Sequence, residues 1–118
     1  MSHRIDKVES LIKEEISLIF LNKLRDHGIG FVTITNVKMS PDLRIAKVYI
    51  SVLDRDKRET VLEKINSFNS YVRSELAHRI KIKFTPELKF FIDDTLDYVE
   101  KIEGLIKKIH EDDNKRNE

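Results

Sequence analysis

The sequence contains no cysteine, which excludes disulfide bonds and thiolate chemistry, whether as a nucleophile or as a metal ligand. It also has no apolar run long enough to cross a bilayer, and its first residues do not combine a basic segment with an apolar one. Membrane insertion and secretion by a signal peptide therefore lack support. We expect a cytoplasmic protein that does not bind a membrane.

Recognisable catalytic and metal-binding motifs are also missing. Glycine occurs only three times, and no phosphate-binding loop, dinucleotide fingerprint or Ser-His-Asp set is recognisable. Glu75 and His78 share a predicted helix face, but a metal site needs ligands from further helices, so we interpret them as an exposed pair. Asp93, Asp94 and Asp97 could bind a hard cation, yet acids at a helix start also stabilise its dipole, and we interpret them as a cap. We expect no enzymatic activity, no cofactor, no metal and no small-molecule substrate.

What the chain does have is an uneven distribution of charge. The formal net charge is only +1, and 118 residues with 40% hydrophobic content can support one compact domain. Residues 38–58 contain six Lys or Arg against three Asp, and residues 73–91 contain five against two Glu. From residue 91 onward, nine Asp or Glu oppose five Lys or Arg. A basic middle is therefore followed by an acidic end.

Residues 32–52 predict a β-hairpin. Two runs rich in Val, Ile, Thr and Tyr flank residues 40–43, in which Pro occupies the second position of a turn. The second run alternates between apolar residues and others such as Lys47 and Tyr49, which predicts one face on a core and one polar face. The apolar parity of the first run changes near residues 35–36, which predicts a β-bulge.

Helical periodicity flanks the hairpin on both sides. Apolar residues spaced by three and four predict a first helix up to about residue 24, and Gly28 and Gly30 provide positions that end it. A second helical pattern covers residues 56–80, and its Asn- and Ser-rich tract at residues 66–70 predicts a kink. Alternation after Pro86 predicts a third strand, which is followed by a last helix that starts at Asp94 or Thr95.

The order of these elements predicts an α+β fold in two layers, with a three-stranded sheet packed against helices. We expect one domain over residues 1–110. Residues 111–118 are charged and contain no apolar side chain, so we expect a disordered tail there.

Several polar side chains in and after the hairpin are candidates for RNA binding. Cations neutralise phosphates and release counterions, which makes binding sensitive to salt. A helix that starts at Asn69 and Ser70 offers free N–H groups to a phosphate, and Tyr49 could stack on a base. The candidate cations are Arg44, Lys47, Arg73, Arg79, Lys81, Lys83 and Lys89. Two simpler interpretations stay open, because charged residues are mostly solvated and aromatic residues often fill cores; for Tyr71 and Phe91 we favour burial.

Two blocks of the sequence resemble a known family. They are SPDLR-x-AKVY-x-S at residues 40–51 and TPELKF at residues 85–90, and they are specific in combination. With weaker matches at residues 4–26, 32–37 and 72–76, they resemble the bacterial ribosome-binding factor A family over about residues 4–109. The resemblance implies a KH-like fold of the type II order (α-β-β-α-kink-α-β) with an added C-terminal helix. It also implies binding to the immature small ribosomal subunit and its RNA, and help with late maturation of the 5′ region of that RNA, especially in the cold.

The chain departs from the family pattern at the kink, where the family usually has Ala, one residue and then Gly. This chain has Phe68-Asn69-Ser70 instead. We therefore predict that Phe68 lies in the core and that Asn69 and Ser70 make the bend. Like the family, the chain has no GXXG loop, so the RNA contacts of other KH domains cannot be assigned to it.

Two functions from different classes remain as hypotheses. The first is a monomeric, non-catalytic RNA-binding assembly factor that acts on the precursor of the small ribosomal subunit. The alternative is a protein-interaction module that docks a protein partner through an exposed strand edge or through the last helix. The alternative predicts binding that is insensitive to salt and no affinity for RNA.

Overall fold

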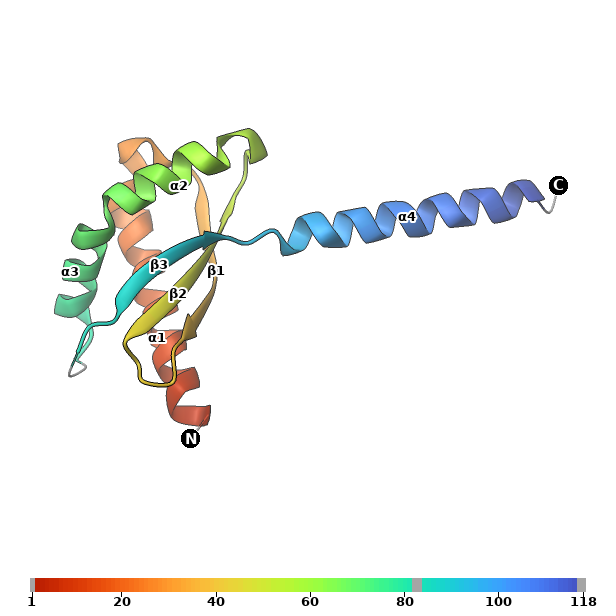
Figure 1. Cartoon of the computed structure of the whole chain (residues 1–118). Helices are drawn as coiled ribbons and strands as arrows, with labels where there is room; N and C mark the ends of the chain where they lie inside the picture. Colours follow the sequence, from red (N-terminus) through yellow and green to blue (C-terminus); the bar gives the residue numbers. More distant parts are fainter. Residues whose placement is uncertain (1, 82–83, 117–118) are drawn as a thin grey trace.

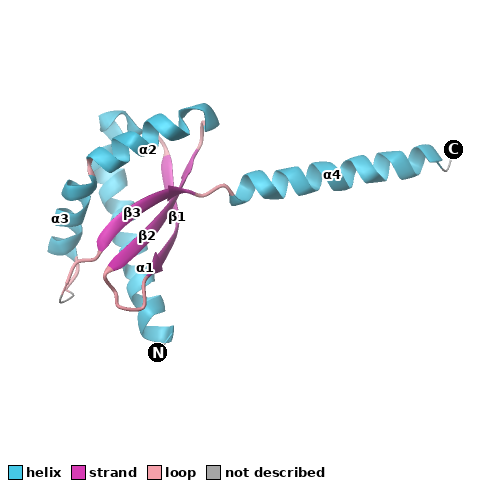
Figure 2. Ribbon diagram, viewed as in Figure 1, coloured by secondary structure: helices cyan, strands magenta, loops and turns pink. Residues whose placement is uncertain are grey.

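The computed structural model describes residues 2–81 and 84–116 (Figure 1). Three strands form one sheet, and helices pack against it. The elements in chain order are helix α1 (Ser2–Ile19), the wider helical segment η1 (Phe20–Ile29), strands β1 (Val32–Met39) and β2 (Ile45–Val52), the 3₁₀ turn η2 (Arg55–Lys57), helices α2 (Arg58–Ser67) and α3 (Asn69–Arg79), strand β3 (Glu87–Ile92) and helix α4 (Thr95–Arg116). Helices α1, α2 and α3 lie on one side of the sheet, and α4 extends away from the rest of the molecule (Figure 2).

The sheet has the strand order β1-β2-β3. β1 and β2 are antiparallel and form the predicted hairpin, and the N–H of Leu43 donates to the carbonyl of Ser40 at 2.9 Å to close its turn. Ile34 pairs with Ile50 while Asn36 pairs with Tyr49, so Thr35 is an extra residue and the predicted bulge is confirmed. β3 is parallel to β2, which requires the crossover that α2 and α3 provide.

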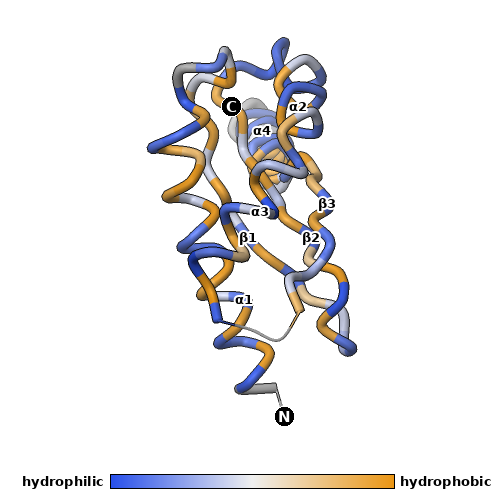
Figure 3. The backbone as a smooth tube through the Cα atoms, turned by 90° about the vertical axis from the view of Figure 1, so that its left-hand side faces the viewer, coloured by the Kyte–Doolittle hydropathy of each residue, from blue (hydrophilic) through white to orange (hydrophobic). Residues whose placement is uncertain are grey.

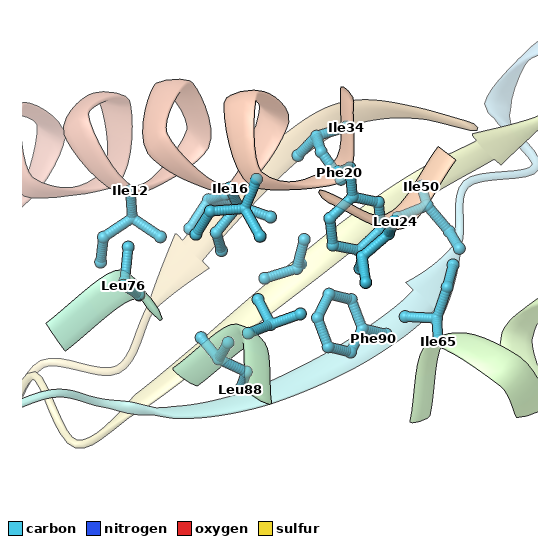
Figure 4. Close-up of a cluster of buried hydrophobic side chains, with 14 of the residues drawn as sticks. Ile12, Ile16, Phe20, Leu24, Ile34, Ile50, Ile65, Leu76, Leu88 and Phe90 are labelled. Carbon is cyan, nitrogen blue, oxygen red and sulfur yellow. The ribbon is translucent and has the colours of Figure 1, made fainter. Parts of the chain in front are cut away.

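A single hydrophobic core fills the space between the helices and the sheet (Figure 4). The apolar stripe of α1 and η1 contributes buried residues such as Ile12, Ile16 and Leu24, and hydrophobic and hydrophilic residues alternate along this helix (Figure 3). The helical segment η1 ends as predicted, because Gly28 and Gly30 have φ values of 81° and 71°, which favour glycine. The described helices include none that is long and apolar enough to span a membrane.

The break predicted within residues 66–70 is confirmed between α2 and α3, but the prediction that Asn69 and Ser70 make the bend is wrong. Phe68 leaves the helical conformation with φ −95° and ψ 6°, whereas Asn69 and Ser70 already belong to the first turn of α3. The side chain of Phe68 is half-buried against the core, and its ring lies 5.6 Å from that of His27. The amide of Asn69 donates to the carbonyl of Leu88 at 2.9 Å and ties the bend to β3. The bend therefore occurs where Phe68 turns toward the core, and Asn69 holds it in place.

Helix α4 begins where the sequence predicts. The carbonyl of Asp94 accepts the N–H of Asp97 at 3.0 Å, and the carboxylate of Asp93 accepts the N–H of Thr95 at 3.0 Å. The helix continues to Arg116 and so includes residues 111–116, for which we expected disorder.

The observed element order is the one predicted, with the kink in place and one helix added at the end. The α+β class, the two layers and the KH-like type II order are therefore confirmed.

Candidate nucleic-acid interface

The sheet face opposite α1, α2 and α3 carries the polar and aromatic side chains of the strands, and we call it the open face. Along each strand, buried residues alternate with more exposed ones, as in β2, where Ala46 and Val48 are buried and Lys47 is exposed. The pairing of the strands then decides which exposed residues are neighbours across this face.

Three lysines lie side by side on the open face. Lys47 of β2 is the register partner of Lys38 on β1 and of Lys89 on β3, and all three are exposed. Within residues 2–81 and 84–116, none of the three forms a salt bridge. We call them the lysine row. Like charges directly across a sheet are destabilising, so this arrangement favours the approach of an anion.

Lys47 and Lys89 were predicted as candidates, whereas sequence reasoning missed Lys38. The bulge at Thr35 shifts the parity of β1, so the face of Lys38 could not be assigned from the start of the strand. A signal was nevertheless present, because Lys38 lies between the apolar residues Val37 and Met39 and must face away from their side.

Two aromatic rings lie next to the lysine row. Tyr49 pairs with Phe91 across β2 and β3, and their rings stack with centroids 5.6 Å apart at an interplanar angle of 30°. Phe91 is 40% exposed and Tyr71, on α3, is 41% exposed, so the expectation that both are buried is wrong. Phe90 fills the core position of β3 instead, and its neighbour Phe91 must point to the opposite face. We call Tyr49 and Phe91 the aromatic pair.

A polar hollow of about 260 Å³ adjoins the aromatic pair. It is lined by Asn36, Lys38, Tyr49, Ile92, Asp93, Asp94 and Thr95. The hydroxyl of Thr35 donates to Asp93 at 2.6 Å and the side-chain oxygen of Asn36 accepts the N–H of Val37 at 2.9 Å, which leaves the NH₂ group of Asn36 as a donor. Hydrogen bonds from Thr35 and Thr95 hold the pKa of Asp93 below its usual range.

The lowered pKa of Asp93 predicts a contribution to stability that depends on pH. Such a carboxyl group stabilises the fold above its unfolded pKa, about 3.9, and this contribution is lost as the pH falls through the folded value. Between about pH 5 and pH 2, the melting temperature of the wild type should therefore fall more steeply than that of Asp93→Asn. Thermal unfolding monitored by circular dichroism measures both. Asp6→Asn removes an exposed carboxylate from α1 as a control and should behave like the wild type, and equal slopes for all three proteins would contradict the role of Asp93.

The remaining predicted residues lie elsewhere. Arg44 is on the hairpin turn with a side chain 84% exposed, and its guanidinium lies 3.9 Å from Asp42. Arg73 of α3 donates to the carbonyl of Thr85 at 2.9 Å. Ser70 and Lys81 are exposed near the two ends of α3. Lys83 lies outside the described residues.

Two predicted residues are engaged within the protein. Arg79 lies 3.5 Å from Glu15 of α1 and 3.9 Å from Glu75 of its own helix. Asn69 donates to β3, as described above. Both therefore connect elements of the fold. Of the predicted residues that the structure describes, Lys47, Tyr49 and Lys89 lie together on the open face.

The three acids at the start of α4 form contacts within the protein. Asp93 and Asp94 provide the cap, as predicted, and Asp97 accepts two hydrogen bonds from Arg58 at 2.6 and 3.1 Å. Arg55 lies 3.1 Å from Asp97 and also pairs with Glu100. The described residues include no group of three or more acids or histidines that could hold a metal ion.

Comparison with known proteins identifies the family. The family model for ribosome-binding factor A matches residues 4–106. The chain belongs to the ribosome-binding factor A family. It is 42% identical to ribosome-binding factor A of Thermodesulfovibrio yellowstonii over 106 residues, which cover 90% of each chain. It is 40% identical to that of Macrococcus caseolyticus over 113 residues, which cover 95% of this chain and 99% of the other.

Solved structures agree with the fold. A Thermotoga maritima protein studied by NMR in solution is 30% identical, with a TM-score of 0.66 over 77% of this chain and 88% of the other. The crystal structure of ribosome-binding factor A from Thermus thermophilus is 20% identical in sequence and has a TM-score of 0.67, and the match covers 75% of this chain and 94% of the other. A homology model of the Thermus protein, fitted into a cryo-EM map of a 30S complex, is 19% identical and has a TM-score of 0.63. This match covers 74% of this chain and 92% of the other.

The two sequence blocks that resemble the ribosome-binding factor A family are neighbours in the structure. The first forms the hairpin turn and most of β2, and the second leads into β3. Ala46, Lys47 and Val48 of the first block pair with Leu88, Lys89 and Phe90 of the second. The residues that carry the resemblance therefore include two members of the lysine row.

Proposed function

We propose that the chain is a non-catalytic ribosome assembly factor of the cytoplasm, which acts as a monomer on the immature small ribosomal subunit. In this proposal, residues 1–110 form one RNA-binding domain, which binds the ribosomal RNA and assists late maturation of its 5′ region, especially in the cold. Membership of the ribosome-binding factor A family supports the proposal, as does the relative fitted into a 30S complex. The observation that carries it is the lysine row on the open face.

The lysine row supports RNA as the partner for an energetic reason. Three neighbouring ammonium groups without acidic partners repel one another, and a row of phosphates relieves this repulsion while it releases counterions. Arg44, Ser70, Arg73 and Lys81 remain proposed phosphate contacts outside the open face, and Lys83, which lies outside the described residues, remains a proposed contact as well. We assign Asn69 and Arg79 a positioning role, since both are engaged with other parts of the fold.

Binding alone can assist maturation. A protein that has a higher affinity for one arrangement of an RNA shifts the population toward that arrangement by the difference in binding free energy. No covalent step is required, so the proposed factor acts stoichiometrically, by binding alone.

Co-sedimentation tests the proposal. The purified protein is mixed with free small subunits, precursor small subunits and complete ribosomes over a range of salt concentrations. We expect selective binding to small subunits, strongest for the precursor and weaker as the salt concentration rises. Absence of binding to every particle at low salt would contradict the proposed function.

A second candidate function is docking of a protein partner, and the exposed apolar stripe of α4 favours it. Val99, Ile102, Ile106 and Ile109 are between 43% and 61% exposed along this helix. Under the assembly-factor proposal, the double variant Ile102→Ser and Ile106→Ser should bind small subunits as well as the wild type does. Loss of binding, or binding that does not respond to salt, would favour the protein-docking function instead.

A further inference from the structure

The open face brings three kinds of group together. The lysine row and the aromatic pair lie two residues apart on β2 and β3, and the polar hollow is lined by Lys38 of the row and Tyr49 of the pair and extends to Asp93 and Asp94. Two residues of a strand span about 7 Å. This spacing is comparable to the size of a nucleotide, which carries a phosphate at one end and a base at the other.

The stacked pair stabilises the pairing of β2 with β3, but the hydrophobic core does not require Phe91 on the open face. Phe91 is 40% exposed although Phe90 already supplies the aromatic ring that the core needs at β3. A large apolar ring that stays in water loses the free energy that burial would provide. The stacked geometry with Tyr49 holds the ring in one orientation, so a planar ligand meets a prepared surface.

The neighbouring groups determine which planar ligand fits. The lysine row is complementary to a chain of phosphates, and the hollow offers the amide donor of Asn36 and the carboxylates of Asp93 and Asp94 to the edge of a base. Exposed aromatic side chains on a sheet are a known way to stack the bases of single-stranded RNA. A base inside a duplex cannot reach such rings, because it is already stacked on its neighbours.

We infer that the open face binds single-stranded RNA, with an unpaired base stacked on Phe91 and Tyr49 and the adjacent phosphates on Lys38, Lys47 and Lys89. The inference rests on the proposed function, because it names the RNA class that this surface selects. In this inference, the aromatic pair selects unpaired RNA, and the lysine row provides the part of the affinity that depends on salt.

Titration of RNA oligonucleotides tests the inference. A fluorescein-labelled single strand of about ten nucleotides, and the same strand annealed to its complement, are titrated with the full-length protein and followed by anisotropy. The wild type should prefer the single strand. Phe91→Ala should weaken binding of the single strand about tenfold, while the slope of log K against log salt stays the same because no cation is lost.

Matched variants separate stacking from folding. Tyr71→Ala removes an aromatic side chain of almost equal exposure, 41%, from α3 and should leave the affinity unchanged. Phe91→Tyr should bind the single strand with the affinity of the wild type, because the ring remains available for stacking. In a strand that contains 2-aminopurine, fluorescence should be quenched by the wild type and by Phe91→Tyr, and less by Phe91→Ala, in which only Tyr49 remains for stacking.

Failure of the inference differs from failure of the proposed function. Equal affinity for single and double strands, together with an unchanged affinity of Phe91→Ala, would overturn the inference even if the protein sediments with small subunits. If Phe91→Ala weakened the binding of small subunits but not that of RNA strands, the rings would contact protein, and the inference would again be wrong. Absence of sedimentation with every particle would instead refute the proposed function.

Discussion

The triple variant Lys38→Gln, Lys47→Gln and Lys89→Gln should bind small ribosomal subunits about 50-fold more weakly than the wild type at about 0.15 M salt. Each lysine that contacts a phosphate releases counterions, so the slope of log K against log salt should also decrease by about 2. The fold should be no less stable, because the substitutions remove repulsion between like charges across the sheet. Quantitative co-sedimentation and thermal unfolding measure the two effects.

A second triple variant controls for net charge. Lys101→Gln, Lys107→Gln and Lys108→Gln remove the same charge from exposed positions of α4. We expect less than a threefold loss of affinity, because general attraction between exposed charges is largely screened at this salt concentration. Equal losses in the two triple variants would show that overall charge, and not the lysine row, determines binding.

The order of the elements could be predicted from the sequence because it depends on local periodicity. The apolar stripe of α1, the alternation of β2 and even the bulge at Thr35 are recorded in the spacing of apolar residues. The helix end at Gly28 and Gly30 follows in the same way from the conformational freedom of glycine. In each case, neighbouring residues in the chain contain the information.

What could not be predicted depends on partners that are distant in the chain. The lysine row exists only because Lys47 pairs with Lys38 on one side and Lys89 on the other, and no local pattern gives the pairing with Lys89 on the distant strand β3. The exposure of Phe91 depends on which of two adjacent phenylalanines faces the core. The bend at Phe68 likewise depends on a contact with His27 and on the hydrogen bond from Asn69 to Leu88.

The same reasoning explains the mixed outcome for the predicted cations. Charge and position in the sequence do not reveal whether a side chain is already paired. Arg79 was a reasonable candidate, but Glu15 on α1 lies 3.5 Å from it and neutralises it. Lys47 and Lys89 form no salt bridge with any described residue, so they keep their charge available for a ligand.

The variant Leu76→Ala should destabilise the fold by about 2–5 kcal/mol. Leu76 is fully buried on α3 and lies near Ile12 of α1 (Figure 4). Its truncation leaves a cavity where α3 packs against α1, because neighbouring side chains relax only in part. The free energy of unfolding of a domain of this size is only about 5–15 kcal/mol, so the substitution removes a large fraction of the stability. Urea unfolding followed by circular dichroism gives the free energy of unfolding.

Leu96→Ala makes the same chemical change on α4, where the side chain is 65% exposed, and should alter stability by at most about 0.5 kcal/mol. The pair of variants therefore also tests the conformation of α4 in solution. Its first two turns are held by Arg55 and Arg58, and the apolar stripe beyond them is exposed. A cost for Leu96→Ala close to that for Leu76→Ala would mean that the start of α4 is covered in solution, by another part of the chain or by a second copy. A small cost would show that this part of α4 stays exposed in solution.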